Sequence, residues 1–160
     1  MTGSQPEYAF EDMVEGLKLP FGAHQVSKEA IIEFASIYDA QPFHLDEEAG
    51  KASVLGGLAA SGWHTAALVM RMIHDAYLGR SRVQGGPGVE FLRWKRPVLA
   101  GDTLSGVSTV IERRVLKSRP HLGLVRFYHE VVNQNDMVVC EMQNPVIFEL
   151  RDQPQPGAAQ

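Results

Sequence analysis

The stretch Gly62-Trp-His-Thr-Ala-Ala-Leu-Val-Met-Arg-Met-Ile-His-Asp-Ala-Tyr-Leu78 decides the fold. Its apolar side chains recur at helical spacing, at Ala66, Ala67, Val69, Met70 and Ile73. The spacing predicts one long helix that stops at Gly79, because glycine is common just past helix ends. The wider apolar run from Val54 to Met72 is interrupted by three glycines, a histidine and an arginine. It is therefore expected to be buried in protein and not to cross a membrane.

Four long segments with partial alternation of apolar and polar residues follow this helix. They are Val89–Arg96, Thr103–Arg114, Leu122–Val132 and Met137–Leu150. The residues Asn133–Asp136 predict a hairpin turn, and Pro145 predicts a bulge or an edge position in the last strand. Helix first and antiparallel strands afterwards is an α+β pattern. We expect one long central helix wrapped by an antiparallel sheet.

The part of the chain before residue 62 is predicted to be mainly helical. Ser27 is a candidate N-cap for a helix over Lys28–Tyr38. Pro42 disfavours a helical conformation at the residue before it, so residues 39–44 are predicted to form a loop. The acids of Asp46–Ala49 are placed well to open a short helix.

Composition limits the class of protein. The 160 residues suit one domain, expected over 1–151, with a proline-rich and flexible tail over 152–160. The net charge of −4 argues against a general nucleic-acid binder. Cys140 is the only cysteine, which excludes an internal disulfide framework and a cysteine-based zinc site. The first residues do not read as a secretory signal, and we expect a cytoplasmic protein.

The hexapeptide Asp39-Ala-Gln-Pro-Phe-His44 carries the most suggestive chemistry. A carboxylate and an imidazole on a short, proline-stiffened segment are suited to exchanging protons with a bound water near neutral pH. Spacing alone leaves a second interpretation open, in which Asp39 caps a helix and His44 lies on the surface. His64 and His74 are ten residues apart, so they cannot form a helical metal pair, and no metal is predicted.

This hexapeptide resembles the Asp-x-Asn-Pro-x-His motif of the MaoC-like dehydratases and (R)-specific enoyl-CoA hydratases. The flanking segments 34–39, 57–63, 93–98 and 100–104 are similar to the family's surroundings of that motif, and the resemblance spans Tyr8–Leu150. Gln41 stands where the motif has asparagine. The amide is retained but is one methylene longer, and we expect activity to survive with an altered loop contact.

The resemblance implies a single hot-dog fold with its active site at a dimer interface. It implies that Asp39 and His44 are the acid–base pair that adds water to a trans-2-enoyl thioester, or removes it from a 3-hydroxyacyl thioester. It also implies that the backbone N–H of Gly62 binds the thioester oxygen. The unpaired N–H groups of a helix N-terminus suit that role, although the glycines also suit close packing. Met70 is a candidate for the acyl pocket.

The expected partner is an acyl-CoA thioester, with coenzyme A as part of the substrate and no separate cofactor. Charged strand residues are more often a solvated face, but six basic residues could contact its phosphates: Arg93, Lys95, Arg96, Arg113, Arg114 and Lys117. A homodimer is expected, because two copies would cover exposed sheet edges.

Two alternative functions are considered. A hot-dog thioesterase typically carries an acidic residue on the central helix, where this chain offers only Asp75 near the far end. A non-catalytic acyl-binding module is the other alternative, and the retained Asp39 and His44 count against it.

Overall fold

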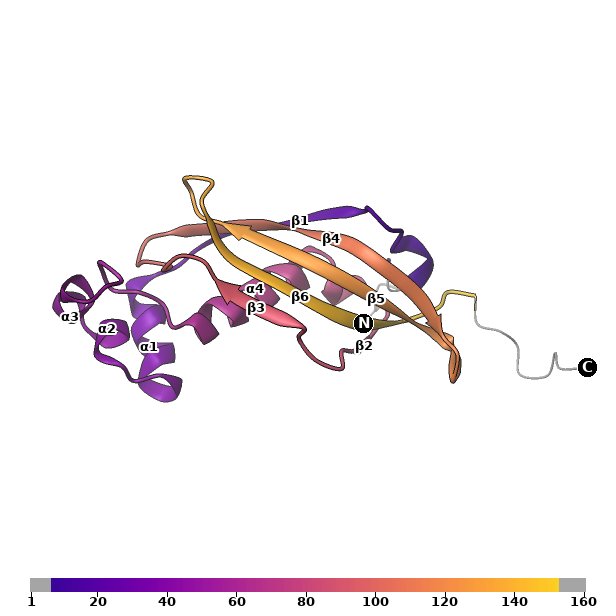
Figure 1. Cartoon of the computed structure of the whole chain (residues 1–160), viewed down its shortest axis with the longest axis horizontal. Coiled ribbons are helices and arrows are strands. Elements are labelled where there is room, and N and C mark those ends of the chain that lie inside the picture. The colour runs from indigo at the N-terminus through magenta and orange to yellow at the C-terminus, as the bar shows by residue number, and fades with distance from the viewer. Residues whose placement is uncertain (1–6, 153–160) are drawn as a thin grey trace, which may run out of the picture.

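A six-stranded antiparallel sheet wraps one long helix, α4 (Gly62–Ala76), in the computed structural model, which describes residues 7–152 (Figure 1). The strand order is β1-β4-β5-β6-β2, and β3 also pairs with β6. The strands are β1 Lys18–Gln25, β2 Val83–Gly85, β3 Phe91–Trp94, β4 Thr103–Leu116, β5 Arg119–Val132 and β6 Val138–Glu149. The expected α+β architecture is confirmed. The tail beyond residue 152 lies outside the described residues.

The core lies between α4 and the inner face of the sheet. Val69 and Ile73 of α4 are buried, and Val125, Phe127 and Val131 of β5 are fully buried opposite them. Burying each such side chain stabilises the fold by roughly 1.5–3 kcal/mol. The opposite face of α4, which carries Trp63 and Met70, is exposed in the single chain, so the sheet covers this helix on one side only.

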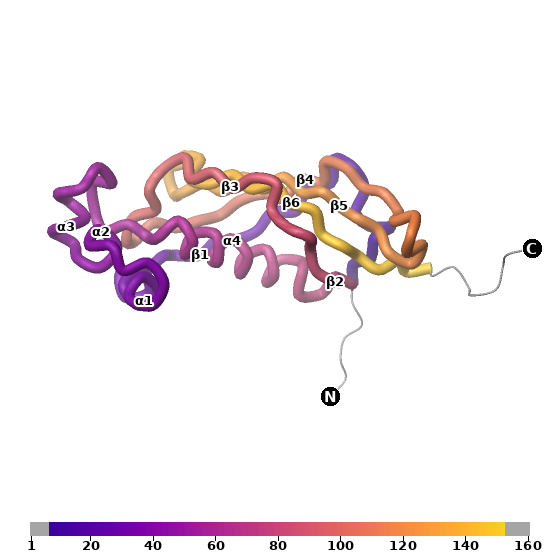
Figure 2. Tube along the Cα trace, turned by 60° about the horizontal axis from the view of Figure 1, so that its bottom comes forward, coloured from indigo at the N-terminus to yellow at the C-terminus, as the bar shows by residue number. Residues whose placement is uncertain are grey.

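Three shorter helices gather at one end of the sheet, beyond the N-terminus of α4 (Figure 2). They are α1 (Lys28–Tyr38), α2 (Pro42–Leu45) and α3 (Glu47–Ala52). The predicted cap of α1 is confirmed, because the Ser27 hydroxyl accepts a hydrogen bond from the N–H of Ala30 at 3.1 Å. The predicted start of α3 is confirmed by the Asp46 carboxylate, which accepts from the N–H of Ala49 at 2.8 Å.

The prediction of a loop over residues 39–44 was wrong in its second half. Gln41 is extended, as expected of a residue before proline. Pro42 then begins the helix α2, because its fixed φ suits the first helical turn and its missing N–H is not needed there. His44 is therefore held on a helical turn.

Two strands and one helix end were not predicted correctly. The first half of the chain contains β1, in which only Phe21 is buried, so the strand lacks the alternation that would reveal it. The short strand β2 was also missed, and β3 is shorter than predicted. The helix α4 ends at Ala76 with Tyr77 as its cap. Gly79 instead lies in a 3₁₀ turn, where an added Cβ would meet the His74 ring at 2.8 Å.

Pro145 does not cause a bulge. It pairs with Arg126 of β5 in an uninterrupted register. On the other side of β6, β3 pairs as far as Gln143 and β2 begins at Ile147, so Pro145 occupies a local edge as predicted. The hairpin turn over Asn133–Asp136 is also confirmed. No helix within residues 7–152 is long and apolar enough to cross a membrane.

Candidate active site

The end of α1 and the turn of α2 bring Asp39 and His44 together. His44 Nε2 lies 3.5 Å from Asp39 Oδ2. His44 is buried, with only 6% of the residue's surface exposed, so it is not a surface residue. The two residues that the hexapeptide singled out are therefore neighbours.

The backbone of Ala59 fixes the tautomer of His44. His44 Nδ1 lies 2.6 Å from the carbonyl oxygen of Ala59. A carbonyl oxygen only accepts, so Nδ1 carries the proton in this hydrogen bond. The neutral ring then has its lone pair on Nε2, the atom that faces Asp39. This is the arrangement that a general base requires.

Two side chains hold the Asp39 carboxylate. The Ser61 hydroxyl donates to Oδ2 at 2.6 Å, and the Gln41 amide donates to Oδ1 at 2.8 Å. These hydrogen bonds, the one from Ser61 first, lower the pKa of Asp39 below its usual value. The carboxylate is therefore ionised near neutral pH. Gln41 still reaches Asp39 despite its extra methylene.

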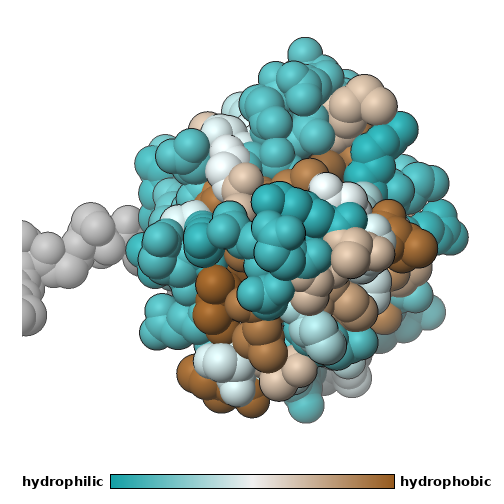
Figure 3. Space-filling model, turned by 90° about the vertical axis from the view of Figure 1, so that its left-hand side faces the viewer, coloured by the Kyte–Doolittle hydropathy of each residue, from teal (hydrophilic) through white to brown (hydrophobic). Residues whose placement is uncertain are grey.

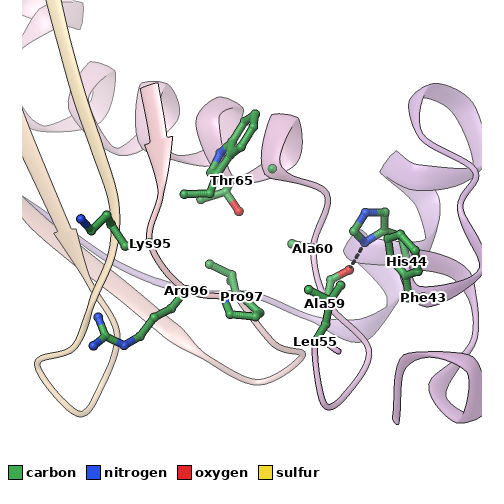
Figure 4. Close-up of a pocket in the computed structure, with 12 residues that line it drawn as sticks. Phe43, His44, Leu55, Ala59, Ala60, Thr65, Lys95, Arg96 and Pro97 are labelled. Carbon is green, nitrogen blue, oxygen red and sulfur yellow. Dashed lines mark hydrogen bonds between the residues drawn. The ribbon is translucent and has the colours of Figure 1, made fainter. Parts of the chain in front are cut away.

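A cavity of about 310 Å³ opens beside His44 (Figure 4). His44 and Ala59 lie on one side of it, and Thr65 of α4 lies across from them. Its full lining is Phe43, His44, Leu55, Ala59, Ala60, Gly62, Thr65, Trp94, Lys95, Arg96, Pro97 and Val98. Most of these residues are apolar, so a ligand here would lie in a weakly polar environment. Asp39 contacts His44 without lining the cavity itself.

Gly62 lines the same cavity and is the first residue of α4. Its N–H belongs to the first turn, where helix donors have no intrahelical partner. A Cβ at this position would lie 2.5 Å from the indole ring of Trp94. Gly62 is thus required for close packing as well as suited to ligand binding, and both interpretations of this glycine apply.

Met70 and Asp75 lie away from this site. Met70 is 43% exposed on the outward face of α4 and does not line the cavity, so one chain alone does not bring it to His44. Asp75 forms an ion pair with Arg71 at 2.8 Å and borders a second cavity of about 200 Å³ beside β1. Of the candidate phosphate ligands, only Lys95 and Arg96 reach the wall of the first cavity.

Sequence reasoning missed three groups that shape the site. They are the Ser61 hydroxyl, the Ala59 carbonyl and the Thr65 side chain. Ser61 could have been noticed as a serine directly before a predicted helix, which is the usual N-cap pattern. Its hydroxyl makes no cap hydrogen bond and instead binds Asp39, 22 positions earlier.

Solved structures share this fold. A MaoC-like dehydratase from Rhodospirillum rubrum is 39% identical, with a TM-score of 0.82 over 90% of this chain and 98% of its own. The R-hydratase PhaJ1 from Pseudomonas aeruginosa is 23% identical, with a TM-score of 0.70 over 94% of this chain and 96% of its own. Rv0216 from Mycobacterium tuberculosis, described as a double hot-dog fold, is 21% identical, with a TM-score of 0.78 over 93% of this chain and 46% of its own.

These likenesses identify the helix-and-sheet architecture as a hot-dog fold. The sequence pattern of the family described as "MaoC like domain" matches residues 18–133, which include the hexapeptide, Ser61 and Gly62. That match covers well over half of the chain. The chain therefore belongs to the MaoC-like domain family.

Proposed function

We propose that this protein is a hydratase/dehydratase that interconverts a trans-2-enoyl thioester and a 3-hydroxyacyl thioester. The observation that carries the proposal is the pair of Asp39 and His44, 3.5 Å apart, with His44 lining a cavity that Gly62 also lines. An ionised carboxylate and an imidazole with a free lone pair suit the binding and activation of one water molecule. The dehydratase named in the 39% identical structure agrees with this chemistry.

In the proposed hydration, the thioester oxygen accepts a hydrogen bond from the Gly62 N–H. Water held by His44 Nε2 and Asp39 Oδ2 attacks C3 and loses a proton to this pair. The electron pair of the double bond moves toward the thioester oxygen, and the pair then returns a proton to C2. The two residues share these proton transfers. A single donor to such an oxygen contributes roughly 3 kcal/mol of transition-state stabilisation.

Hydrolysis of the thioester is the weaker alternative. It would require a carboxylate or nucleophile beside the thioester carbon, and Asp75 is the only acid on α4. Asp75 is paired with Arg71 and borders the second cavity, away from His44. Coenzyme A enters the proposed reaction only as part of the substrate.

We also propose that two copies of the chain associate. Trp63 and Met70 on the outward face of α4 are 62% and 43% exposed, and Trp94 on β3 is 46% exposed beside Trp63. At the end that carries α1–α3, apolar and polar surface residues are interspersed (Figure 3). The chain of Rv0216 from M. tuberculosis, of which this fold covers 46%, is described as a double hot-dog fold. Sedimentation equilibrium of the wild type and of Trp63→Ala tests this association.

The first experiment follows the absorbance of crotonyl-CoA and of branched and dicarboxylic analogues, together with release of free thiol. We expect loss of the enoyl absorbance without thiol release. Asp39→Asn and His44→Ala should each lower kcat by about 10²–10⁴, the range for general acid–base groups, while circular dichroism stays native. Thiol release by the wild type would identify a thioesterase, and full activity in both variants would reject the proposed pair.

A further inference from the structure

Thr65 is the one hydroxyl-bearing side chain that lines the cavity beside His44 within residues 7–152. It is only 2% exposed, and it lies on α4 one turn after Gly62. Its backbone N–H donates to the Ser61 carbonyl at 3.0 Å, as the helix requires. Across the described residues 7–152, its hydroxyl makes no hydrogen bond, although buried hydroxyls usually have a partner.

The hydroxyl of Thr65 differs from the ring of His64, which is the residue before it on this helix. The His64 Nδ1 atom is sealed from solvent and has no partner within residues 7–152. The Thr65 oxygen is not among the sealed atoms, because its side chain borders the cavity. A threonine inside a helix commonly donates to the carbonyl four residues earlier, but here that carbonyl, of Ser61, receives only the backbone N–H. The hydroxyl is therefore available to a ligand.

Helix geometry directs this hydroxyl toward Gly62. In an α-helix each Cα–Cβ bond tilts toward the N-terminus, so residues three apart lie one above the other on the same face. The Thr65 oxygen points to the side of the cavity that holds Ala60 and His44 (Figure 4). The Gly62 N–H and the Thr65 O–H thus border the same part of one cavity.

We propose that the Thr65 hydroxyl is a second hydrogen-bond donor to the thioester oxygen, beside the Gly62 N–H. This inference rests on the proposed hydration. Negative charge moves onto that oxygen as water adds at C3 and leaves it when C2 is protonated. A fixed donor in a cavity with mostly apolar walls stabilises such charge more than water does. The Thr65 hydroxyl, which no protein group occupies within residues 7–152, can make this hydrogen bond without breaking one inside the fold.

Thr65→Val is a sharper test than any substitution of Gly62. Valine keeps the branched shape of threonine and removes only the hydroxyl, whereas a Cβ at Gly62 would collide with Trp94. With crotonyl-CoA, we expect Thr65→Val to lower kcat about 10- to 100-fold, somewhat less than the loss of one strong oxyanion donor. KM should change less than about threefold, and Thr65→Ser should recover most of kcat. Unchanged kcat in Thr65→Val would overturn the inference.

A spectroscopic measurement separates this inference from the proposed function. The conjugated thioester of 2,4-hexadienoyl-CoA absorbs at longer wavelength when donors polarise its carbonyl oxygen. We expect a red shift on binding to the wild type, a smaller one with Thr65→Val, and recovery with Thr65→Ser. If the wild type shows the shift but hydrates nothing, hydration fails while the role of Thr65 stands. An equal shift in Thr65→Val rejects Thr65 alone, and absence of binding rejects both proposals.

Discussion

His44 and His129 are both buried histidines with hydrogen-bonded rings, yet their surroundings differ. His44 faces the Asp39 carboxylate and lines a cavity. His129, on β5, is 2% exposed and lines neither of the two cavities. Its Nδ1 lies 2.8 Å from Ser108 Oγ, and its Nε2 lies 2.8 Å from Asn144 Oδ1. The Tyr77 hydroxyl donates to Ser108 at 2.9 Å and completes a buried chain.

The partners of each ring explain the difference in chemistry. All partners of His129 are neutral, and burial lowers its pKa to about 4. The ring therefore stays neutral near pH 7, with Nε2–H donating to Asn144 and Nδ1 accepting from Ser108. His44 instead has one nitrogen held by a backbone carbonyl and the other directed at an ionised acid. Burial with hydrogen bonds gives a structural histidine, whereas proton transfer also needs a carboxylate and access to substrate.

Exchanging each histidine for alanine tests this comparison most strongly. His44→Ala should reduce kcat by about 10²–10⁴ and change stability little, because it removes the proposed acid–base group. His129→Ala should lower the free energy of unfolding by about 3 kcal/mol, because it leaves a cavity and unpaired polar groups in the core. Urea unfolding followed by circular dichroism, together with kcat per folded molecule, measures both effects.

The comparison fails if the two effects are exchanged. A stable His129→Ala protein with little kcat would place His129 in the reaction. A strongly destabilised His44→Ala protein would make the Asp39–His44 contact chiefly structural. Thr65→Val is the control for the unfolding measurement. It removes a buried polar group of the cavity but leaves no large void.

Acid should destabilise the protein through His129. Its folded-state pKa of about 4 is below the unfolded value of about 6.5. The stability that the protein gains by keeping His129 neutral is fully present above pH 6.5 and is lost as the pH falls toward 4. The whole change is about 3 kcal/mol. The pKa of His64 is also lowered, chiefly by burial, and adds in the same direction. Unfolding free energies at several pH values between 7.5 and 4 measure the loss.

His129→Gln is the matched variant for this titration, because glutamine is polar but has no ionisable group. It should show a smaller loss of stability between pH 7.5 and 4 than the wild type. Equal slopes in the two proteins would mean that His129 does not control acid stability. The stability that comes from the lowered pKa of Asp39 is lost only in a more acidic range, because this carboxylate is protonated below pH 3.8.

Local patterns were enough to predict the elements that build the core. The 3.6-residue spacing of α4 and the alternation along β5 both arise from burial on one face, so periodicity reveals them. β1 escaped prediction because it is an edge strand with one buried residue out of eight. Pro42 was read as ending helical structure, although the same fixed φ also starts it.

The site was predictable only where its residues are close in sequence. Asp39 and His44 are five positions apart, and the hexapeptide contains both. The hydrogen bond from Ser61 to Asp39 and that from His44 to the Ala59 carbonyl join positions 22 and 15 residues apart. A backbone carbonyl leaves no trace in residue identity, so such a contact becomes visible only when the fold brings the segments together.

The smallest expected effects concern the two donors that hold Asp39. Ser61 contributes most to the lowered pKa of Asp39, and Gln41 contributes less. Removing either donor should raise that pKa, so the acid limb of kcat/KM should move to higher pH. We expect Ser61→Ala to lower kcat/KM roughly 10-fold, consistent with loss of a hydrogen bond to a charged group. Gln41→Ala should lower it only about threefold, because its amide is more exposed and water can replace it.

Gln41→Asn is the control for this pair, because it shortens the amide to the length of the family motif while keeping the donor. It should retain nearly all activity and the wild-type acid limb. The pH profiles of kcat/KM for the three variants show which donor, Ser61 or Gln41, lowers the pKa of Asp39 more. If Gln41→Ala moved the acid limb further than Ser61→Ala, the loop amide would hold the carboxylate more firmly than the serine does. The lowered pKa of Asp39 would then come chiefly from Gln41 in its own segment, and not from Ser61 at the N-terminus of the central helix. The pKa of His129, in contrast, is set by its burial in the core.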